Sequence, residues 1–273
     1  MRAALLQTTT GIDPDVNASA LVDAVAEAKR QGADMLFTPE MSGLLDRDRA
    51  RAATSIVAEE EDRVLAAVRD AAARHGLWVH LGSLAVRRDD GRYANRGFVV
   101  DASGAVRARY DKLHLFDVTL ATGESWRESA AYAAGEAAVV VDTPVGRLGL
   151  SICYDLRFPA LYAALSGAGA TVMAIPAAFT RPTGHAHWHV LMRARAIESA
   201  AFVLAAAQTG CHEDGRETYG HSLVVDPWGE VLADMGETPG LTVVGLDRAQ
   251  VAAVRARVPV IEHRRAIPPV TRA

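Results

Sequence analysis

Cysteine is scarce in this 273-residue sequence, which holds only Cys153 and Cys211. The two residues lie far apart and outside any Cys-x-x-Cys spacing, so they form neither a disulfide framework nor a zinc ribbon. A reducing compartment suits such a chain, and we expect the protein to be cytoplasmic.

The sequence also lacks features that mark whole classes of protein. Its net charge of −4 leaves no basic footprint for nucleic acid. No apolar stretch approaches the ~20 residues that span a membrane, and the N-terminus turns polar too early for a secretory signal. Glycine patterns that bind phosphate are absent, so we expect no nucleotide. We also expect the protein to need neither a metal nor an organic cofactor.

Strand-like apolar runs alternate with helical stretches along the chain. Some strands are joined by tight turns and others by helices, which favours a layered α/β domain with mixed sheets. Residues 117–137 lack periodicity and are expected to form a functional loop. We expect one domain over residues 1–273, with its core at about 1–246 and a C-terminal helix and tail at 247–273. The predicted strands are 3–7, 34–38, 77–86, 96–101, 105–110, 138–142, 147–152, 171–175, 201–207, 221–226, 230–233 and 241–246. The predicted helices are about 20–28, 58–74, one after 159, 188–199 and 247–256. The acidic residues 59–62 are expected to begin the helix at 58–74.

Three of these strands are each followed by a reactive side chain. Glu40 follows the second strand, Lys112 follows the strand at 105–110, and Cys153 follows the strand at 147–152. In open α/β sheets, sites gather just beyond the carboxyl ends of strands. The three groups are therefore candidates for one site, although spacing alone does not show that they meet.

Cys153 lies between a strand end and a helix expected after Pro159. A buried cysteine is usually an inert small hydrophobe. In this position, however, backbone N–H groups would favour the thiolate and would face a developing oxyanion. Cys211 lies in a polar turn and is read as incidental.

Glu40 and Lys112 each have an ordinary and a functional interpretation. Glu40 is either a surface carboxylate at a loop start or a general base whose pKa is raised by desolvation. Lys112 has apolar neighbours that suggest burial, and a buried lysine needs an acidic partner. Either Glu40 or Glu128 could be that partner.

The three segments together resemble the signatures of the nitrilase, or carbon–nitrogen hydrolase, superfamily. They read FTPE at 37–40, YDKLHLF at 110–116 and ICYDLRFP at 152–159, and the likeness runs to about residue 246. The resemblance implies an α/β fold, a four-layer α-β-β-α sandwich with two mixed β-sheets. It also implies that two chains pair across helices into a dimer.

Further segments resemble the Nit-type amidase branch, which includes ω-amidases and deaminated-glutathione amidases. They are WRES at 126–129, PAAFT at 176–180, PTG at 182–184, RARAIE at 193–198 and YGHSLVVDPWG at 219–229. The resemblance implies Glu40 as general base, Lys112 as oxyanion stabiliser, Cys153 as nucleophile and Glu128 as the glutamate that holds Lys112. The Tyr154 N–H would be a second oxyanion donor, with Phe179 and Thr180 in the substrate site.

The sequence departs from this branch at three places. Residues 121–123 replace a Pro-Gly-Gly-like turn, residues 133–134 replace a usual Thr-Pro, and His189 stands where Glu is common. These changes spare the catalytic residues but concern the substrate loop.

The implied activity is cysteine-dependent hydrolysis of a linear carboxamide, a 2-oxo acid amide, to the acid and ammonia through a thioester. Arg157 is suited to grip the substrate's carboxylate, or else it forms a salt bridge within the site, for example to Asp155. An N-carbamoyl amine is an alternative substrate, and a non-catalytic interaction module on the same fold is an alternative of another class. The three histidines at 185, 187 and 189 would not share a face at the start of a helix, so we expect no metal enzyme.

Overall fold

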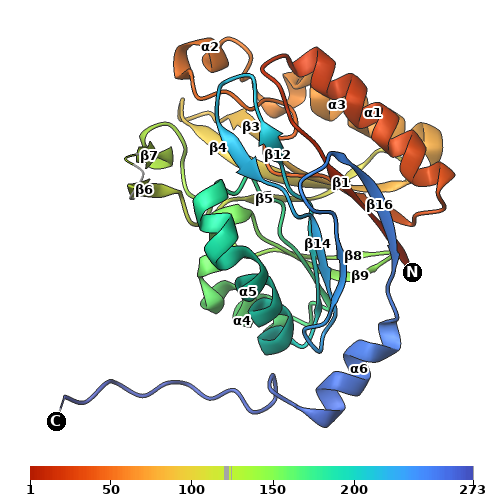
Figure 1. Ribbon diagram of the computed structural model, residues 1–273, viewed down its shortest axis with the longest axis vertical. Coiled ribbons are helices and arrows are strands. Elements are labelled where there is room, and N and C mark those ends of the chain that lie inside the picture. Colours follow the sequence, from red (N-terminus) through yellow and green to blue (C-terminus); the bar gives the residue numbers. More distant parts are fainter. Residues whose placement is uncertain (120–122, 124, 273) are drawn as a thin grey trace.

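Two six-stranded sheets lie face to face, with helices over the outer face of each (Figure 1). The computed structural model describes residues 1–119, 123 and 125–272. The predicted four-layer α-β-β-α sandwich with two mixed sheets is confirmed. Within the described part of the chain, no helix is both long and apolar enough to cross a bilayer.

The first sheet has the strand order β16-β1-β2-β3-β4-β5. Strands β1, β2 and β3 run parallel, and the remaining neighbours pair antiparallel. The strand bounds are β1 (Arg2–Gln7), β2 (Met35–Phe37), β3 (Trp78–Arg87), β4 (Tyr93–Val100), β5 (Val106–Asp111) and β16 (Gly240–Gly245).

The second sheet has the order β15-β14-β11-β10-β9-β8. Here β9, β10 and β11 run parallel, and antiparallel strands flank them on both sides. The bounds are β8 (Val140–Thr143), β9 (Gly146–Leu150), β10 (Val172–Ala174), β11 (Phe202–Ala205), β14 (Leu223–Val225) and β15 (Val231–Asp234).

Alternation along β1 decides which face of the first sheet meets which layer. Ala3 and Leu5 join a hydrophobic cluster with the strands of the second sheet. Ala4 faces the other way, into a cluster with helices α1 (Pro14–Arg30) and α3 (Arg63–His75). On the far side, α4 (Pro159–Gly167) and α5 (Arg181–Ser199) cover the second sheet (Figure 1). The cluster shared by both sheets supports the interpretation of one domain, which stays a prediction.

Some element bounds differ from those predicted. The acidic residues near 60 do not begin a helix: Glu59–Glu61 form a 3-10 turn, and the Asp62 carboxylate accepts from Leu65 N–H as the N-cap of α3. Helix α5 starts at Arg181, earlier than predicted, because Pro182 suits a first helical turn. Helix α6 (Arg248–Arg257) precedes an exposed tail.

Short elements were not predicted from the sequence. The segment 117–137 is not wholly irregular: β6 (Asp117–Thr119) pairs with β7 (Ser125–Arg127), and a 3-10 turn follows at Glu128–Ala130. Residues 121 and 122, part of the departure at 121–123, lie outside the described residues. The other additions are α2 (Arg49–Ala53) and the ribbon of β12 (Thr209–Cys211) and β13 (Glu217–Tyr219).

Candidate active site

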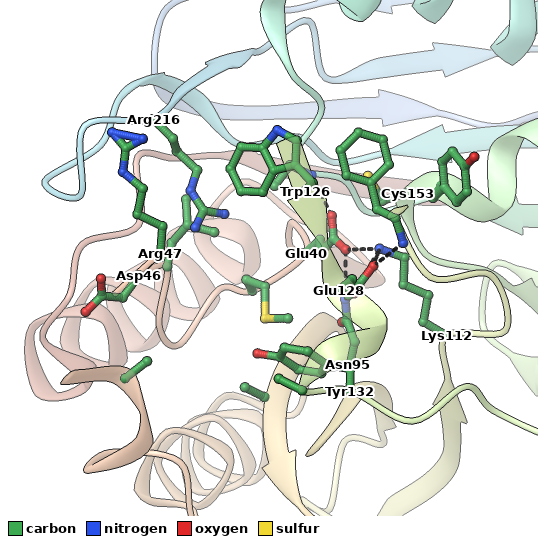
Figure 2. A pocket seen from close by; sticks show the side chains of 18 of the residues that line it. Glu40, Asp46, Arg47, Asn95, Lys112, Trp126, Glu128, Tyr132, Cys153 and Arg216 are labelled. Carbon is green, nitrogen blue, oxygen red and sulfur yellow. Dashed lines mark hydrogen bonds and ion pairs between the residues drawn. The ribbon is translucent and has the colours of Figure 1, made fainter. Parts of the chain in front are cut away.

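Four side chains predicted to act in catalysis line one cavity of about 410 Å³ (Figure 2). They are Glu40, Lys112, Cys153 and Glu128. The first two follow strands of the first sheet, β2 and β5, whereas Cys153 follows β9 of the second sheet. The ends of strands from both sheets meet at this cavity, which is the arrangement that the positions of these residues after strands predict.

The Glu40 carboxylate is buried and held from three directions. Its Oε1 accepts from Lys112 Nζ at 2.8 Å and from Asn95 Nδ2 at 2.8 Å. Its Oε2 accepts from the Ala178 N–H at 2.9 Å, in the segment that follows β10. Three donors leave the carboxylate little freedom to rotate, so a base at this position has a fixed direction.

Lys112 is only 2% exposed, and two carboxylates surround its ammonium group. Besides Glu40, Nζ contacts Glu128 Oε2 at 3.0 Å and Oε1 at 3.3 Å. Glu128 Oε2 in turn accepts from the Phe116 N–H at 2.7 Å. Both acidic partners considered from the sequence are therefore present, and Lys112 is paired as a buried charge requires.

Asn95 is a site residue that the sequence analysis missed. Its Nδ2 donates to Glu40 Oε1 at 2.8 Å and to Glu128 Oε1 at 3.1 Å, so it links the two carboxylates. Its Oδ1 is buried in the cavity wall and has no hydrogen-bond partner among the described residues. The signal was a polar residue in an apolar strand, but the predicted strand began at 96 whereas β4 begins at Tyr93.

Cys153 has φ = 49°, a left-handed backbone conformation that a residue with a Cβ rarely adopts. It begins a 3-10 turn, Cys153–Arg157, rather than an α-helix, since α4 starts only at Pro159. The Cys153 N–H donates to Pro176 O at 2.9 Å. The Tyr154 N–H has no backbone partner outside that turn among the described residues, and its role as an oxyanion donor stays a prediction.

Asp155 fixes this turn from the buried side. Its Oδ2 accepts from Tyr110 Oη at 2.6 Å and from the Ile152 N–H at 2.9 Å, and its Oδ1 accepts from the His114 N–H at 3.0 Å. The proposed salt bridge between Arg157 and Asp155 is wrong, because these partners already occupy the carboxylate. Asp155 is a positioning residue that local sequence did not identify.

The charges of the site correct two expectations about pKa values. Burial alone would raise the pKa of Glu40, but the Lys112 charge together with hydrogen bonds from Lys112, Cys153 and the Ala178 N–H outweighs burial, so the pKa lies below its ordinary value. Burial, followed by the Glu40 charge, raises the pKa of the Cys153 thiol well above its ordinary value of 9.0. The resting cysteine is thus a thiol rather than the predicted thiolate. Despite burial, which acts in the opposite direction, the carboxylates of Glu128 and Glu40 raise the pKa of Lys112, which stays charged.

The residue predicted as second oxyanion donor and those predicted to bind substrate divide into two groups. Tyr154, Phe179 and Thr180 line the cavity. Arg157 lies behind this wall: its Cζ is 5.9 Å from the ring centre of Tyr154 and 5.3 Å from that of Phe179, and its Nη1 lies 3.2 Å from His187 Nδ1. A substrate carboxylate would have to pass beside these rings to reach Arg157, so its gripping role stays a prediction.

Arginines line the opposite end of the cavity from Cys153 (Figure 2). The guanidinium of Arg216 lies 5.0 Å from the ring centre of Trp126, and its Nε donates to Asp214 Oδ2 at 2.8 Å. Within the described chain, the terminal nitrogens of Arg216 make no hydrogen bond. Arg47 lies beside it, with Nε donating to the Asp214 carbonyl at 2.6 Å. This end of the cavity suits an anionic group, and the sequence analysis did not identify it.

The histidines at 185, 187 and 189 lie within α5, as predicted, and do not share one face. None of them lines the cavity. Among the residues that the structure describes, one group could hold a metal ion: His189, His221 and Asp234.

Comparisons with known proteins identify the family of this chain. A family model described as carbon-nitrogen hydrolase matches residues 2–256. The deaminated glutathione amidase of Yersinia enterocolitica is 37% identical over 96% of this chain and 92% of its own length. The crystal structure of the Caenorhabditis elegans NitFhit protein superposes with a TM-score of 0.89 at 37% identity, covering 97% of this chain and 65% of that chain. A mutant amidase from Nesterenkonia, with acrylamide added at its active-site cysteine, gives a TM-score of 0.80 at 30% identity, covering 95% of this chain and 98% of that chain.

Proposed function

Since this chain belongs to the carbon–nitrogen hydrolase family and is a hydrolase of carbon–nitrogen bonds, we propose that it hydrolyses the carbon–nitrogen bond of a linear 2-oxo acid amide, with Cys153 as nucleophile. The observation that carries the proposal is the buried Glu40–Lys112 contact of 2.8 Å in the cavity that Cys153 also lines. The residues needed for acyl transfer are all present, so a non-catalytic module has no support.

The first half-reaction forms the thioester. Glu40 takes the proton of the Cys153 thiol as sulfur attacks the amide carbon, and the carbonyl oxygen becomes an oxyanion. The Lys112 ammonium and the Tyr154 N–H stabilise that oxyanion. The protonated Glu40 then gives its proton to the amide nitrogen, the carbon–nitrogen bond breaks, and the amine departs.

The second half-reaction returns the enzyme to its starting state. Glu40 takes a proton from water as the water oxygen attacks the thioester carbon. The carbon–sulfur bond then breaks, the acid is released, and the proton on Glu40 returns to the sulfur of Cys153. Because the thiol pKa is raised and the Glu40 pKa is lowered, proton transfer is unfavourable without substrate. The thiol therefore ionises only as it attacks.

The substrate class follows from the relatives and from the cavity. Relatives of this chain carry the name deaminated glutathione amidase, and deaminated glutathione is an amide of a 2-oxo acid. The arginines at the far end of the cavity, Arg216 and Arg47, can bind a substrate carboxylate away from the reacting carbon. We infer that the substrate is anionic.

A substrate screen tests this function. Release of ammonia or amine is measured with 2-oxoglutaramate, 2-oxosuccinamate, deaminated glutathione and N-carbamoyl-β-alanine. We expect turnover of the 2-oxo acid amides and an acyl adduct on Cys153 by intact-mass analysis. Turnover of the N-carbamoyl compound alone, with carbon dioxide released, would replace the proposed substrate class. Full activity in Cys153→Ala would end the proposal for the nucleophile.

We also propose that two copies of the chain pair through α5. Val190 and Ile197 lie on one exposed face of this helix, with 69% and 49% of their surface exposed. Such apolar side chains on a helix are suited to a partner. We propose a cytoplasmic location as well, from the cysteine content.

A further inference from the structure

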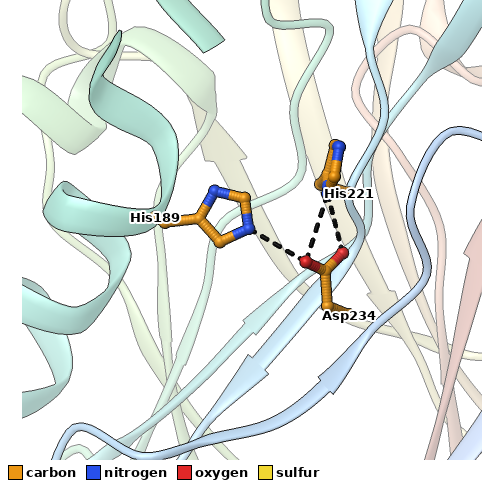
Figure 3. Close-up of side chains that lie close together, drawn as sticks. All are labelled: His189, His221 and Asp234. Atoms are coloured by element: carbon orange, nitrogen blue, oxygen red, sulfur yellow. Dashed lines mark hydrogen bonds and ion pairs between the residues drawn. The ribbon is translucent and has the colours of Figure 1, made fainter. Parts of the chain in front are cut away.

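Three metal-binding side chains from separate parts of the chain meet beside α5 (Figure 3). His189 belongs to α5, His221 precedes β14, and Asp234 ends β15. His189 Nε2 lies 3.0 Å from Asp234 Oδ2. His221 Nδ1 lies 2.8 Å from Oδ1 and 3.1 Å from Oδ2 of the same carboxylate.

These separations suit a four-coordinate cation. Bonds of about 2.0–2.2 Å in tetrahedral geometry place neighbouring ligand atoms roughly 3.3–3.6 Å apart. The candidate ligand atoms here all lie within 4.8 Å of one another, with the closest pair at 2.8 Å. Shifts of about 1 Å or less would therefore open the group around an ion, without a change in the backbone.

The surrounding structure already holds His221 in place. Its φ is 55°, its N–H donates to Gly236 O at 2.6 Å, and its carbonyl accepts from Trp188 Nε1 at 2.8 Å. The Tyr219 ring stacks on the imidazole at 4.4 Å between centres and 22° between planes. Because these contacts already fix the His221 side chain, less conformational entropy would be lost when its imidazole coordinates an ion.

We propose that His189 Nε2, His221 Nδ1 and the Asp234 carboxylate bind one divalent cation of the zinc class, with water in the fourth position. Two imidazoles and one carboxylate favour Zn²⁺, Co²⁺ or Ni²⁺ over Ca²⁺ and Mg²⁺, which prefer oxygen ligands. Asp234 Oδ1 also accepts from the Gly236 N–H at 2.9 Å, which orients the carboxylate from outside the ligand set.

The ion would restrain the wall of the active-site cavity and would take no part in the hydrolysis itself. Thr180 and Thr183, at the start of α5, line the active-site cavity, and so does Thr218 of β13. Tyr219 follows Thr218 and stacks on His221. A cation that joins α5 to β15 would therefore restrain this wall. This role is independent of the proposed amide substrate.

Zinc binding tests the site. Titration calorimetry with Zn²⁺ uses the full chain with Cys153→Ala, because the free thiol in the active-site cavity could bind added zinc and obscure the proposed site. We expect one equivalent to bind and the thermal midpoint to rise with Zn²⁺. His189→Gln and His221→Asn should each weaken binding by roughly 100-fold or more, since loss of an outer partner alone costs 10–100-fold.

These two variants distinguish a metal site from a cluster that only forms hydrogen bonds. The Gln and Asn amides can still donate to Asp234, and Asn tolerates a positive φ, so the apo protein should keep its thermal midpoint. His263→Gln, in the exposed tail, is the matched control and should leave zinc affinity unchanged. Unchanged affinity in either His189→Gln or His221→Asn, or the absence of a one-equivalent site in Cys153→Ala, would overturn the proposal.

Discussion

At the residue scale, Lys112 is the side chain on which the charge balance of the site depends. It is one of two lysines in a chain that otherwise uses arginine for its positive charges. A compact ammonium can direct its three donors at two carboxylates and an oxyanion, whereas a planar guanidinium presents a fixed fork. Without Lys112, the buried Glu40 and the partly buried Glu128 would be two neighbouring carboxylates with no cation between them.

Replacement of Lys112 should therefore damage both catalysis and stability. We expect Lys112→Ala to lower kcat by at least roughly 10²–10³-fold, as the loss of an oxyanion donor does in other hydrolases. The thermal midpoint should fall as well, because buried charges lose their partner. The matched control is Lys29→Ala, whose exposed ammonium contacts only the Gly76 carbonyl among the described residues. Equal activity of the two variants would contradict the role of Lys112.

Titration of the Cys153 thiol tests the charges directly. The rate of iodoacetamide alkylation, followed by intact mass in a Cys211→Ser background, should rise with pH and have its midpoint well above 9.0. Glu40→Gln should lower that midpoint, because it removes a negative charge that raises the thiol pKa and leaves the Lys112 cation that lowers it. A midpoint at or below 9.0 in the unmodified site, or one that rises in Glu40→Gln, would be inconsistent with this balance.

At the scale of elements, β3 approaches the loop that carries Glu40 more closely than a side chain would allow. A Cβ on Gly82 would lie 2.2 Å from Thr38 O and 2.6 Å from Pro176 Cβ. Thr38 precedes the Glu40 turn, and Pro176 accepts the Cys153 N–H. The absence of a side chain at Gly82 thus allows the segments that hold Glu40 and Cys153 to lie against each other.

Gly82→Ala should displace these supports. A shift of about 1 Å at a reacting group can cost roughly 100-fold in rate, so we expect a loss of that order in kcat together with about 1–3 kcal/mol of stability. Enzyme kinetics and thermal unfolding by circular dichroism measure the two effects. Gly245→Ala in β16, where a Cβ meets no atom within 4 Å, should leave both unchanged. An active, stable Gly82→Ala would show that the loop can move without consequence.

The sequence predicted buried strands better than exposed ones, for a physical reason. Apolar runs located the strands that end before Glu40, Lys112 and Cys153, including β2, which has only three residues but is fully buried. β6 and β12 are equally short but partly exposed, so no apolar run marks them in the sequence. The predicted pKa direction of Cys153 was wrong because burial of the thiol, and after it the charge of Glu40, come from parts of the chain that are remote in sequence.

At the scale of the whole molecule, the site spans both sheets of the sandwich. The Glu40 carboxylate from the first sheet accepts from the Ala178 N–H of the second at 2.9 Å. Asp155, after β9, accepts from Tyr110 of β5. The nucleophile and its base therefore meet only when the two sheets pack in one relative position, and activity reports on that packing.

Assembly is a second property of the whole molecule. Val190→Glu with Ile197→Glu would bury unpaired charge if two copies pair through α5. That cost of several kcal/mol should weaken dimerisation by at least about 100-fold. Light scattering after size exclusion should then show a dimer for the parent chain and a monomer for the variant. Val16→Glu, at a residue that is 64% exposed on α1, should stay dimeric. A parent chain that is monomeric at micromolar concentration would refute the pairing.

The two glutamates around one lysine also affect how the product leaves. Glu40 and Glu128 set two carboxyl groups against the single Lys112 ammonium beside the reacting carbon. An amide enters with an uncharged group at that position, but the product leaves it as a new carboxylate, which acidic neighbours repel at short range. The enzyme should therefore show weak inhibition by its own acid product, while the equilibrium between amide and acid stays that of the uncatalysed reaction.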